Sequence, residues 1–345
     1  MKGRALLSPL AVLYRIGLEL WNFSWNFRKA VKIDVPVISV GNLTAGGSGK
    51  TPLTIYLAER FLERQTKPAV LIRGYRRKGK GDLFLLTDTK VVPPVENTGD
   101  EAQLIYRRLS GEVPVGIGRR RERTARFLLE KENPDLFILD DGFQYRKLHQ
   151  DVKIVIINVG SLKEPVRLLP AGDWREPLSA LKRADILIYN FKFEAEEAGV
   201  PDGIPLNKPC FKMSYRATGV VAPELKMLGV EYIKGKKAFA FAGIADPRGF
   251  LKALEATGMK VVGSMFFPDH HWYSDRDLRK ITEGSKKSGA EITITTEKDL
   301  IKLGERGSEI LALRVEPSIE DEEGFWEILE ELLPFEPPET EQREA

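Results

Sequence analysis

A glycine-rich turn that ends in Gly-Lys-Thr is the segment of this chain with the clearest chemical meaning. The turn follows the apolar run Val35–Val40 and precedes a stretch with helical spacing. Its glycines leave backbone N–H groups free to face an anion, and the following helix points its positive end at the same place. In this pattern Lys50 reaches the terminal phosphates of a nucleoside triphosphate such as ATP, and the Thr51 hydroxyl binds Mg²⁺. The predicted phosphate-binding residues are Thr44, Ala45, Gly46, Gly47, Ser48, Gly49, Lys50 and Thr51.

A second candidate is the pair Asp140 and Asp141, which ends the apolar run Leu136–Leu139. In an open α/β sheet, ligands bind at the carboxyl ends of the strands, where this pair would lie. Mg²⁺ prefers oxygen ligands and keeps several waters, so one or two carboxylates are sufficient. The alternative is a simple turn, because Asp-Gly is a common turn signal. Together with the phosphate-binding loop, the pair favours a magnesium site.

Other polar residues have a structural explanation on composition alone. Asp100 and Glu101 begin a predicted helix, where a carboxylate caps free N–H groups. His270 follows a predicted strand, and a single histidine is usually structural. The basic clusters 73–78 and 119–123 are solvated faces by default. Both clusters follow strands, however, so they are also candidates for phosphate contacts at the same edge of the sheet.

The composition is typical of a soluble globular protein. The charged residues are unevenly distributed along the chain. Residues 1–126 hold 23 Lys and Arg against 11 Asp and Glu, whereas residues 316–345 hold 1 against 12. A basic surface suits nucleic acid, an anionic membrane or a phosphorylated substrate. We expect no nucleic-acid partner, because no recognition motif is present and the basic clusters lack interleaved aromatic residues apart from Tyr75. Cys210 is the only cysteine, which excludes a disulfide framework and a cysteine-based metal site.

The amino terminus, residues 1–30, predicts an amphipathic helix. Apolar residues recur at helical spacing from Leu6 to Trp25, while Arg15 and Glu19 interrupt the run, so it is too short to span a membrane. Two interpretations remain open. The helix packs on the core of the protein, or it lies in the membrane interface with tryptophans at the boundary and cations beside anionic headgroups.

The order of elements predicts an α/β fold. Apolar strands separated by helices indicate a P-loop NTPase-type, mainly parallel sheet with helices on both faces. A broken, hairpin-like pattern then precedes a second, smaller α/β set. We therefore predict a P-loop kinase domain at 31–215, a hairpin-like linker into a smaller α/β domain at 216–333, and a disordered acidic tail at 334–345. A cleft between two such domains suits a transferase that closes over two substrates.

Several motifs, in order along the chain, resemble the tetraacyldisaccharide 4′-kinase family, the lipid A 4′-kinases. The first is the segment 39–52, which carries the phosphate-binding loop and in this family has Thr or Ser at the position of Thr44. The others are Arg73–Arg77, Gly99–Glu101, Leu139–Gln144, Leu168–Gly172, Arg175–Leu178, Phe267–His270 and Thr295–Asp299.

The resemblance implies a kinase that transfers the γ-phosphate of ATP to the 4′-hydroxyl of a tetraacylated glucosamine disaccharide 1-phosphate in lipid A biosynthesis. Such an enzyme is expected to act as a peripheral protein on the cytoplasmic face of the bacterial inner membrane, against an anionic surface. A membrane-recruited P-loop ATPase or switch that binds a protein partner is the alternative.

The resemblance also implies roles for residues. Asp100 would be the base for the acceptor hydroxyl, oriented by His270, with Lys50 on the phosphates. Mg²⁺ would be held by Thr51, Asp140, Asp141 and Glu101. The substrate side would comprise Arg73, Tyr75, Arg121, Gln144, Arg175 and Glu176. Tyr145 stands where the family often has histidine, so a substrate contact there departs from the family pattern.

Overall fold

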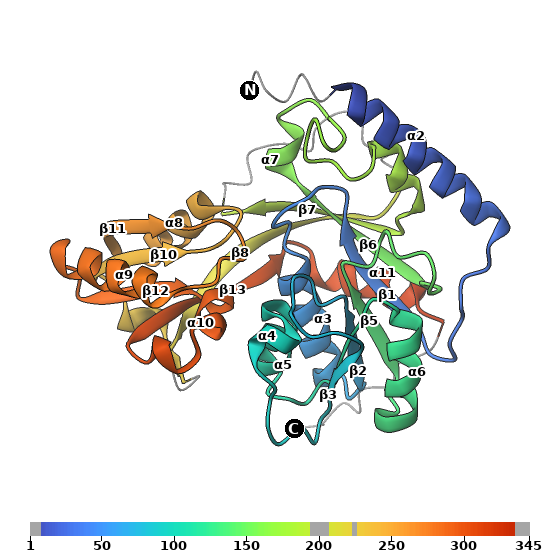
Figure 1. The fold of residues 1–345 in the computed structure, drawn as a ribbon. Helices are drawn as coiled ribbons and strands as arrows, with labels where there is room; N and C mark the ends of the chain where they lie inside the picture. The colour runs from blue at the N-terminus through green and yellow to red at the C-terminus, as the bar shows by residue number, and fades with distance from the viewer. Residues whose placement is uncertain (1–7, 194–206, 223–225, 335–345) are drawn as a thin grey trace.

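The computed structural model describes residues 8–193, 207–222 and 226–334, and its geometry is given for these residues. The predicted tail at 334–345 lies outside them except for residue 334. Within the described residues, one thirteen-stranded sheet runs through the whole molecule. Figure 1 shows it crossing from the orange strands on one side to the blue and teal strands on the other.

The first half of the sheet is centred on β1 (Val37–Asn42). β1 pairs in parallel with β5 (Leu136–Asp140) and with β6 (Val152–Asn158). All residues of β1 and β5 are buried, as apolar strands are in a sheet covered on both faces. The other strands of this half are β2 (Pro68–Ile72), β3 (Leu83–Leu85), β4 (Val115–Ile117) and β7 (Ile186–Lys192).

Helices cover both faces of this half, which confirms the predicted fold class. On one face, Leu53 and Leu57 share a core with Phe325, and on the other Ala125 and Leu128 pack on the opposite side of the same strands. The helices and helical turns here are α3 (Lys50–Glu63), α4 (Val95–Thr98), α5 (Asp100–Arg108), α6 (Arg121–Glu132), α7 (Val159–Leu162), η2 (Leu178–Arg183) and α11 (Glu322–Leu332).

The second half is smaller and again α/β. Its strands are β8 (Cys210–Val221), β9 (Met227–Leu228), β10 (Lys237–Ala242), β11 (Lys260–Phe266), β12 (Ile292–Thr296) and β13 (Ile310–Ile319). Its helices and turns are η3 (Val230–Tyr232), α8 (Pro247–Ala256), α9 (Asp275–Lys287), α10 (Glu297–Leu303) and η4 (Gly304–Gly307). The strand order through the molecule is β11-β10-β12-β13-β8-β7-β6-β1-β5-β2-β4-β3, with β9 paired to β8.

The long strands β8 and β13 make the two halves face each other. The start of β8 pairs in parallel with β7, and the start of β13 pairs in parallel with β12. β8 and β13 are antiparallel, so that Val221 of β8 lies opposite Ala312 of β13 and Met213 opposite Ile319. Each half therefore points its carboxyl ends toward the middle of this strand pair. Two ligand-binding edges of the α/β type meet across one cleft.

The structure also shows how the halves are connected. A β8–β9 hairpin occupies the region where the sequence predicted a hairpin-like linker, but the predicted boundary at 215/216 falls inside β8, which both halves share. Helix α11, placed by sequence in the 216–333 domain, packs instead on α3, where Trp326 Nε1 donates to the Tyr56 hydroxyl at 3.1 Å. The chain returns through β13 to the first half, and the apolar face of α11 is buried there.

Helix α2 (Ser8–Ser24) lies along the outside of the first half, as the blue helix at the upper right of Figure 1. It is anchored by the Tyr14 hydroxyl, which donates to the Arg175 carbonyl at 2.8 Å, and Trp25 just after it is buried. Its outer face exposes large apolar side chains, with Leu13 64% and Leu20 65% exposed. Among the described residues, no helix has the length and apolar character needed to cross a bilayer.

Candidate active site

A cleft of about 1130 Å³ lies where the carboxyl edges of the two halves meet. It is lined by residues from both, including the phosphate-binding loop from Ala45 to Thr51 and, across from it, Ala245, Asp246 and His270. The other predicted site residues on its wall are Arg73, Tyr75, Glu101, Arg121, Asp140, Asp141, Gln144, Arg175 and Glu176. Thr44 and Asp100 lie behind the wall as buried side chains.

The loop after β1 has the backbone that a phosphate cradle requires. Gly46 and Gly49 have φ of 109° and 93°, in the left-handed region that favours glycine, and Gly49 is the N-cap of α3. A Cβ on Gly49 would collide with the Tyr215 hydroxyl. Thr44 is fixed below the loop, where its carbonyl accepts a hydrogen bond from Asn42 Nδ2 at 2.8 Å. The loop is therefore built around glycines that no other residue replaces without strain.

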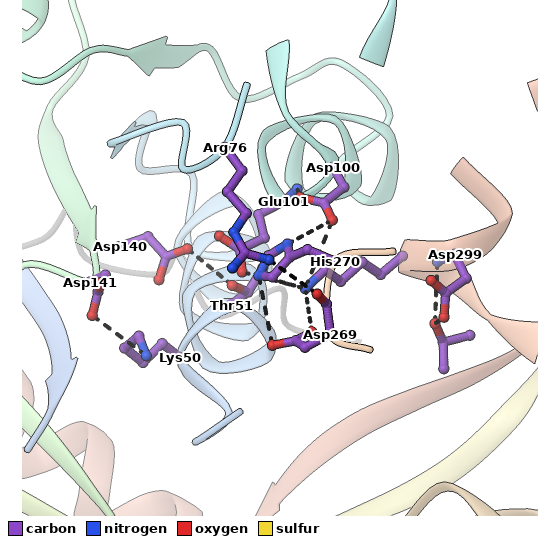
Figure 2. A network of polar contacts seen from close by, with 12 residues as sticks. Lys50, Thr51, Arg76, Asp100, Glu101, Asp140, Asp141, Asp269, His270 and Asp299 are labelled. Atoms are coloured by element: carbon purple, nitrogen blue, oxygen red, sulfur yellow. Dashed lines mark hydrogen bonds and ion pairs between the residues drawn. The ribbon is translucent and has the colours of Figure 1, made fainter. Parts of the chain in front are cut away.

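The Lys50 ammonium lies at the mouth of this loop. Its Nζ donates to Asn42 Oδ1 at 3.3 Å and to Ser48 Oγ at 3.2 Å, and lies 3.5 Å from Asp141 Oδ1. Figure 2 shows Lys50 and Asp141 facing each other, so the cation lies beside one of the two carboxylates that end β5. Asn42 was not assigned a role from sequence, although it belongs to the first family motif, and here it helps orient both Lys50 and Thr44.

Asp140 and Asp141 end β5 at the carboxyl edge but have different surroundings. The Thr51 hydroxyl donates to Asp140 Oδ2 at 3.1 Å, while the buried Oδ1 has no hydrogen-bond partner among the described residues. Burial, together with the nearby Glu101 charge, raises the pKa of Asp140 to about 7. Burial also opposes ionisation of Asp141, but Lys50 and Arg175 outweigh it and lower its pKa. Arg175 Nη1 reaches Asp141 at 3.0 Å.

These oxygens fit Mg²⁺. The described residues contain no cluster of three or more acidic, histidine or cysteine side chains with metal-binding geometry. Mg²⁺ in kinase sites needs only one or two carboxylates beside water and phosphate oxygens. Asp140 supplies one unpartnered buried oxygen beside the Thr51 hydroxyl, and a cation there would relieve the mutual repulsion of Asp140 and Glu101.

Asp100 and His270 meet across the cleft, although 170 residues separate them. Asp100 begins α5 in the first half, and His270 follows β11 in the second, with a left-handed backbone at φ 62°. His270 Nδ1 lies 3.1 Å from Asp100 Oδ2 (Figure 2). Burial opposes ionisation of Asp100, but the hydrogen bond from His270 and the charge of Lys298 outweigh it and hold its pKa below the ordinary value. Asp100 is thus an ionised, buried carboxylate.

Lys298, the first-turn residue of α10, completes this group. Its Nζ lies 3.3 Å from His270 Nε2, 3.8 Å from Asp100 and 3.6 Å from Asp269. Burial disfavours its charge, but the surrounding carboxylates outweigh burial and raise its pKa. No role was predicted for Lys298. The available signal was its place in the Thr295–Asp299 motif, which gave no indication of its partners.

The loop that carries His270 is held in place from behind by the buried carboxylate of Asp299. Asp299 Oδ2 accepts from Gly243 N at 2.9 Å, and the Gly243 carbonyl accepts from His270 N at 3.1 Å, so a buried carboxylate supports the His270 loop. On the other side, Glu297 pairs with Arg108 at 2.8 Å and with Arg314 at 2.9 Å. These pairs join α10 to α5 and β13.

The predicted substrate-side residues differ in how far they are exposed and in what they contact. Tyr75 is exposed and lies edge-to-face with His270 at 5.7 Å between ring centroids. Arg121 is buried with its guanidinium 4.4 Å from the Tyr145 ring, and its Nε has no hydrogen-bond partner in the part of the chain that the structure describes. Gln144 Nε2 donates to the Asn42 carbonyl at 2.8 Å.

Glu176 lies on the cleft wall, as its predicted place on the substrate side requires, but it is largely buried. It is 2% exposed and pairs with Arg183 at 2.6 Å. A substrate contact by Glu176 stays a prediction, and the pairing shows that Arg183 compensates its charge. The Arg183 guanidinium in turn lies 4.4 Å from the Phe143 ring, which ties the pair to the core.

Comparisons with known proteins agree on one family. The family model described as LpxK, "Tetraacyldisaccharide-1-P 4'-kinase", matches residues 3–334. The "Tetraacyldisaccharide 4'-kinase" of Aquifex aeolicus is 38% identical over 323 residues, covering 93% of this chain and 96% of that protein. The protein of the same name from Syntrophus aciditrophicus is 35% identical over 348 residues, covering 95% and 92%.

The fold agrees as well. A crystal structure described as the "apo" form of LpxK from Aquifex aeolicus in complex with ATP superposes with a TM-score of 0.79 at 36% identity. The match covers 96% of this chain and 99% of that one. The sequence motifs, the two-sided α/β cleft and these relatives lead to the same conclusion. The chain belongs to the tetraacyldisaccharide 4′-kinase family.

Proposed function

We propose that the chain works as an ATP-dependent 4′-kinase of lipid A biosynthesis, as its family membership indicates, and that it does so with the residues of the interdomain cleft. The reaction forms a bond between the acceptor 4′-oxygen and the γ-phosphorus while the bond from that phosphorus to the β,γ-bridging oxygen breaks. ADP leaves, and the hydroxyl proton passes to a base. The observation that carries the proposal is that the phosphate-binding loop and His270 line the same cleft, with Asp100 held by His270 directly behind the cleft wall.

On the nucleotide side, the N–H groups of the loop and the Lys50 ammonium bind the phosphates of ATP. Thr51 and Asp140 are the residues that would hold Mg²⁺, with Glu101 and Asp141 on the same wall. When bound, Mg²⁺ neutralises charge on the phosphates. Lys50 moves from its contacts with Asn42 and Ser48 to the phosphate oxygens, an exchange of neutral acceptors for anionic ones that strengthens each hydrogen bond.

On the acceptor side, Asp100 takes the proton of the 4′-hydroxyl. Its carboxylate is ionised and is held in place by His270 from the other half, so the base is assembled only when the halves are together. This arrangement limits transfer of the phosphoryl group to water while the acceptor is absent. Arg73, Tyr75, Arg121, Gln144 and Arg175 on the same wall supply cations, an aromatic face and an amide to orient the sugar and its phosphate.

Helix α2 supports a peripheral membrane location. Its outer face exposes Leu10, Val12, Leu13, Leu20 and Phe23. Arg28, four residues beyond the end of the helix, has its guanidinium 5.6 Å from the Trp21 ring. Apolar side chains beside tryptophan and arginine suit an anionic lipid interface. Tyr14 and Leu18 of the same helix line the cleft, so the membrane would lie beside the entrance for a lipid acceptor. We infer that the enzyme works on the cytoplasmic face of the inner membrane.

The test is a transfer assay. The full chain would be incubated with ATP, Mg²⁺ and tetraacylated glucosamine disaccharide 1-phosphate in detergent, beside the Aquifex aeolicus relative as a positive control. We expect a product phosphorylated at the 4′ position and ADP in equal amount. ATP turnover that needs no lipid and yields no phosphorylated lipid would instead support a P-loop ATPase or switch.

A further inference from the structure

The Lys298 side chain is a cation that reaches across the cleft into the dyad. It comes from α10 of the second half, whereas Asp100 and Glu101 belong to α5 of the first. Its Nζ lies 3.3 Å from His270 Nε2, within hydrogen-bond range, and 3.8 to 3.9 Å from the carboxylates of Asp100 and Glu101. The side chain is mostly buried, so these groups are its immediate surroundings.

A hydrogen bond between the Lys298 ammonium and His270 Nε2 requires one arrangement of protons. An ammonium has three N–H donors and no acceptor, so His270 Nε2 must accept from Lys298 and carries no proton. The imidazole proton is then on Nδ1, where it is donated to Asp100 Oδ2 at 3.1 Å. The other carboxylate oxygen, Oδ1, accepts from the Glu101 N–H at 3.0 Å. Each oxygen of Asp100 thus has a defined donor.

Other groups around His270 do not offer a better partner for Nε2. Asp269 Oδ2 is 3.8 Å from Nε2, beyond hydrogen-bond range. Tyr75 presents its ring to the imidazole, edge-to-face. Arg76 lies near but donates to the Asp269 carbonyl at 3.2 Å. The contact with Lys298 is therefore the one that fixes the ring.

We propose that Lys298 is a positioning residue that holds His270 as the Nδ1–H tautomer and thereby aims the Asp100 carboxylate at the acceptor hydroxyl. The proposal rests on the proposed function, because it assigns Lys298 a part in activating the same acceptor. With Nδ1–H donated to Asp100, the carboxylate is oriented on both oxygens and keeps lone pairs for the incoming proton.

The place of Lys298 is itself fixed by its neighbour in the chain. Glu297 accepts from Arg108, at the other end of α5, and from Arg314 of β13. The amino-terminal turn of α10 therefore contacts α5 at both ends, through Lys298 at Glu101 and Glu297 at Arg108. This pair of contacts holds the amino-terminal turn of α10 against α5 and so positions the Lys298 ammonium beside Asp100 and His270.

The kinetic test compares three variants in the lipid transfer assay. Lys298→Met removes the donor and keeps the length of the side chain. We expect it to lose on the order of 10- to 100-fold in kcat, a part of the usual contribution of a positioned base, with little change in the KM for ATP. Lys298→Arg still donates only, so it should retain about tenfold more kcat than the methionine variant. Lys280→Met, at an exposed position of α9, should match the unmodified enzyme.

The spectroscopic test reads the tautomer directly. The chain has only three histidines, so a protein labelled with ¹⁵N-histidine gives few imidazole signals, and the loss of one set in His270→Gln assigns that residue. In the full chain saturated with Mg²⁺ and a non-hydrolysable ATP analogue, long-range ¹H–¹⁵N correlation should show a protonated Nδ1 and an unprotonated Nε2. Lys298→Met should change the Nε2 signal, whereas a merely structural role would leave it in place.

The two possible failures are distinguishable. A protonated Nε2 in the unmodified protein, or a Lys298→Met enzyme with unchanged kcat, overturns the role of Lys298 while lipid-dependent transfer by the unmodified enzyme still stands. If the unmodified enzyme makes no phosphorylated lipid, the proposed function fails, and the imidazole signals still report whether Lys298 fixes the tautomer. Thermal melting of each variant separates loss of fold from loss of chemistry.

Discussion

Asp100 and Asp140 are both buried carboxylates at one cleft. Their different surroundings suit them to different roles. Asp100 accepts hydrogen bonds and lies near a lysine, which keeps its pKa low. Asp140 shares its space with Glu101 and has an oxygen without a partner, which raises its pKa to about 7. A carboxylate already satisfied by protein donors is suited to hold a fixed position, whereas an unsatisfied one is suited to bind a cation.

The raised pKa of Asp140 predicts a cost in stability when nucleotide and metal are removed. The pKa is about 3.9 in an unfolded chain and about 7 in the folded one. Because the folded state binds the proton more tightly, the free energy of unfolding should decrease as the pH rises from about 4 to about 7. Asp140→Asn removes the charge, so above pH 7 the variant should be more stable than the unmodified protein by roughly 1 to 3 kcal/mol, although inactive.

This prediction is checked by urea unfolding in EDTA between pH 5 and 8, as the difference between the two proteins. Asp88→Asn, at an exposed position, serves as the control and should give a flat difference. A gap between Asp140→Asn and the unmodified protein that does not widen as the pH rises would contradict the assignment. Mg²⁺ and ATP should reduce this difference in stability, because they bind the unmodified protein with Asp140 in its ionised form.

At the residue scale, the position of a site residue could be predicted from the sequence wherever its side chain follows a parallel strand. Lys50, Thr51, Asp140 and Arg73 could be placed at one edge because strand carboxyl ends coincide. Lys298 and the pairing of Glu176 with Arg183 could not be predicted in this way. The contacts of Lys298 depend on how two halves far apart in the chain meet, which no local pattern encodes. Glu176 and Arg183 are only seven residues apart in the first half, and their pairing depends on the turn of the chain through η2.

At the scale of elements, the start of α3 sets the geometry of the phosphate-binding loop. Gly49→Ala should weaken ATP binding at least tenfold and destabilise the protein by about 1 to 3 kcal/mol. A Cβ there meets the Tyr215 hydroxyl, and the left-handed backbone disfavours it further. Gly17→Ala, in helix α2 with no atom within 4 Å of its added Cβ, is the matched control and should leave both unchanged. Calorimetric titration measures ATP affinity, and thermal melting measures stability. If Gly49→Ala and Gly17→Ala behave alike in both measurements, the assignment of this loop as the phosphate-binding site is wrong.

The outer face of α2 gives a prediction about the membrane. Leu13→Asp combined with Leu20→Asp replaces two exposed leucines, each contributing about 2 kcal/mol if it is buried in lipid. We expect the double variant to lose flotation with vesicles of phosphatidylethanolamine and phosphatidylglycerol, while the detergent assay stays near normal. Val91→Asp, at an exposed site in the loop after β3, controls for added negative charge. Flotation equal to that of the control would show that this face is not the membrane contact.

Most strands and helices could be predicted as elements, because apolar runs and helical spacing are local properties. The apolar run Val35–Val40 overlaps β1, and the apolar run Leu136–Leu139 lies within β5. The sharing of β8 between the halves and the return of α11 to α3 could not be predicted. Both depend on pairing between segments about 100 or more residues apart, which hydrophobic periodicity does not specify.

At the scale of the whole molecule, the antiparallel pair β8–β13 explains why one chain has two facing ligand edges. A single open sheet offers one such edge, and a kinase with a large acceptor must hold two substrates at once. Here the second half contributes His270, Lys298 and Asp269 to a base that belongs to the first half. The relative placement of the halves is thus part of the chemistry, and a change in it would affect the dyad before it affected the phosphate-binding loop.

A double-mutant cycle across the cleft measures this dependence. Asp100→Asn should lower kcat by on the order of 10²- to 10⁴-fold with little change in the KM for ATP, and His270→Gln should lower it as well. Because the two side chains form one unit 3.1 Å apart, the double variant should be no slower than the slower single variant. Effects that instead multiply would mean that the residues act independently, each from its own half. Since neither side chain contacts the phosphate-binding loop, ATP affinity should be nearly equal in all four proteins, and this equality separates loss of the base from loss of the fold.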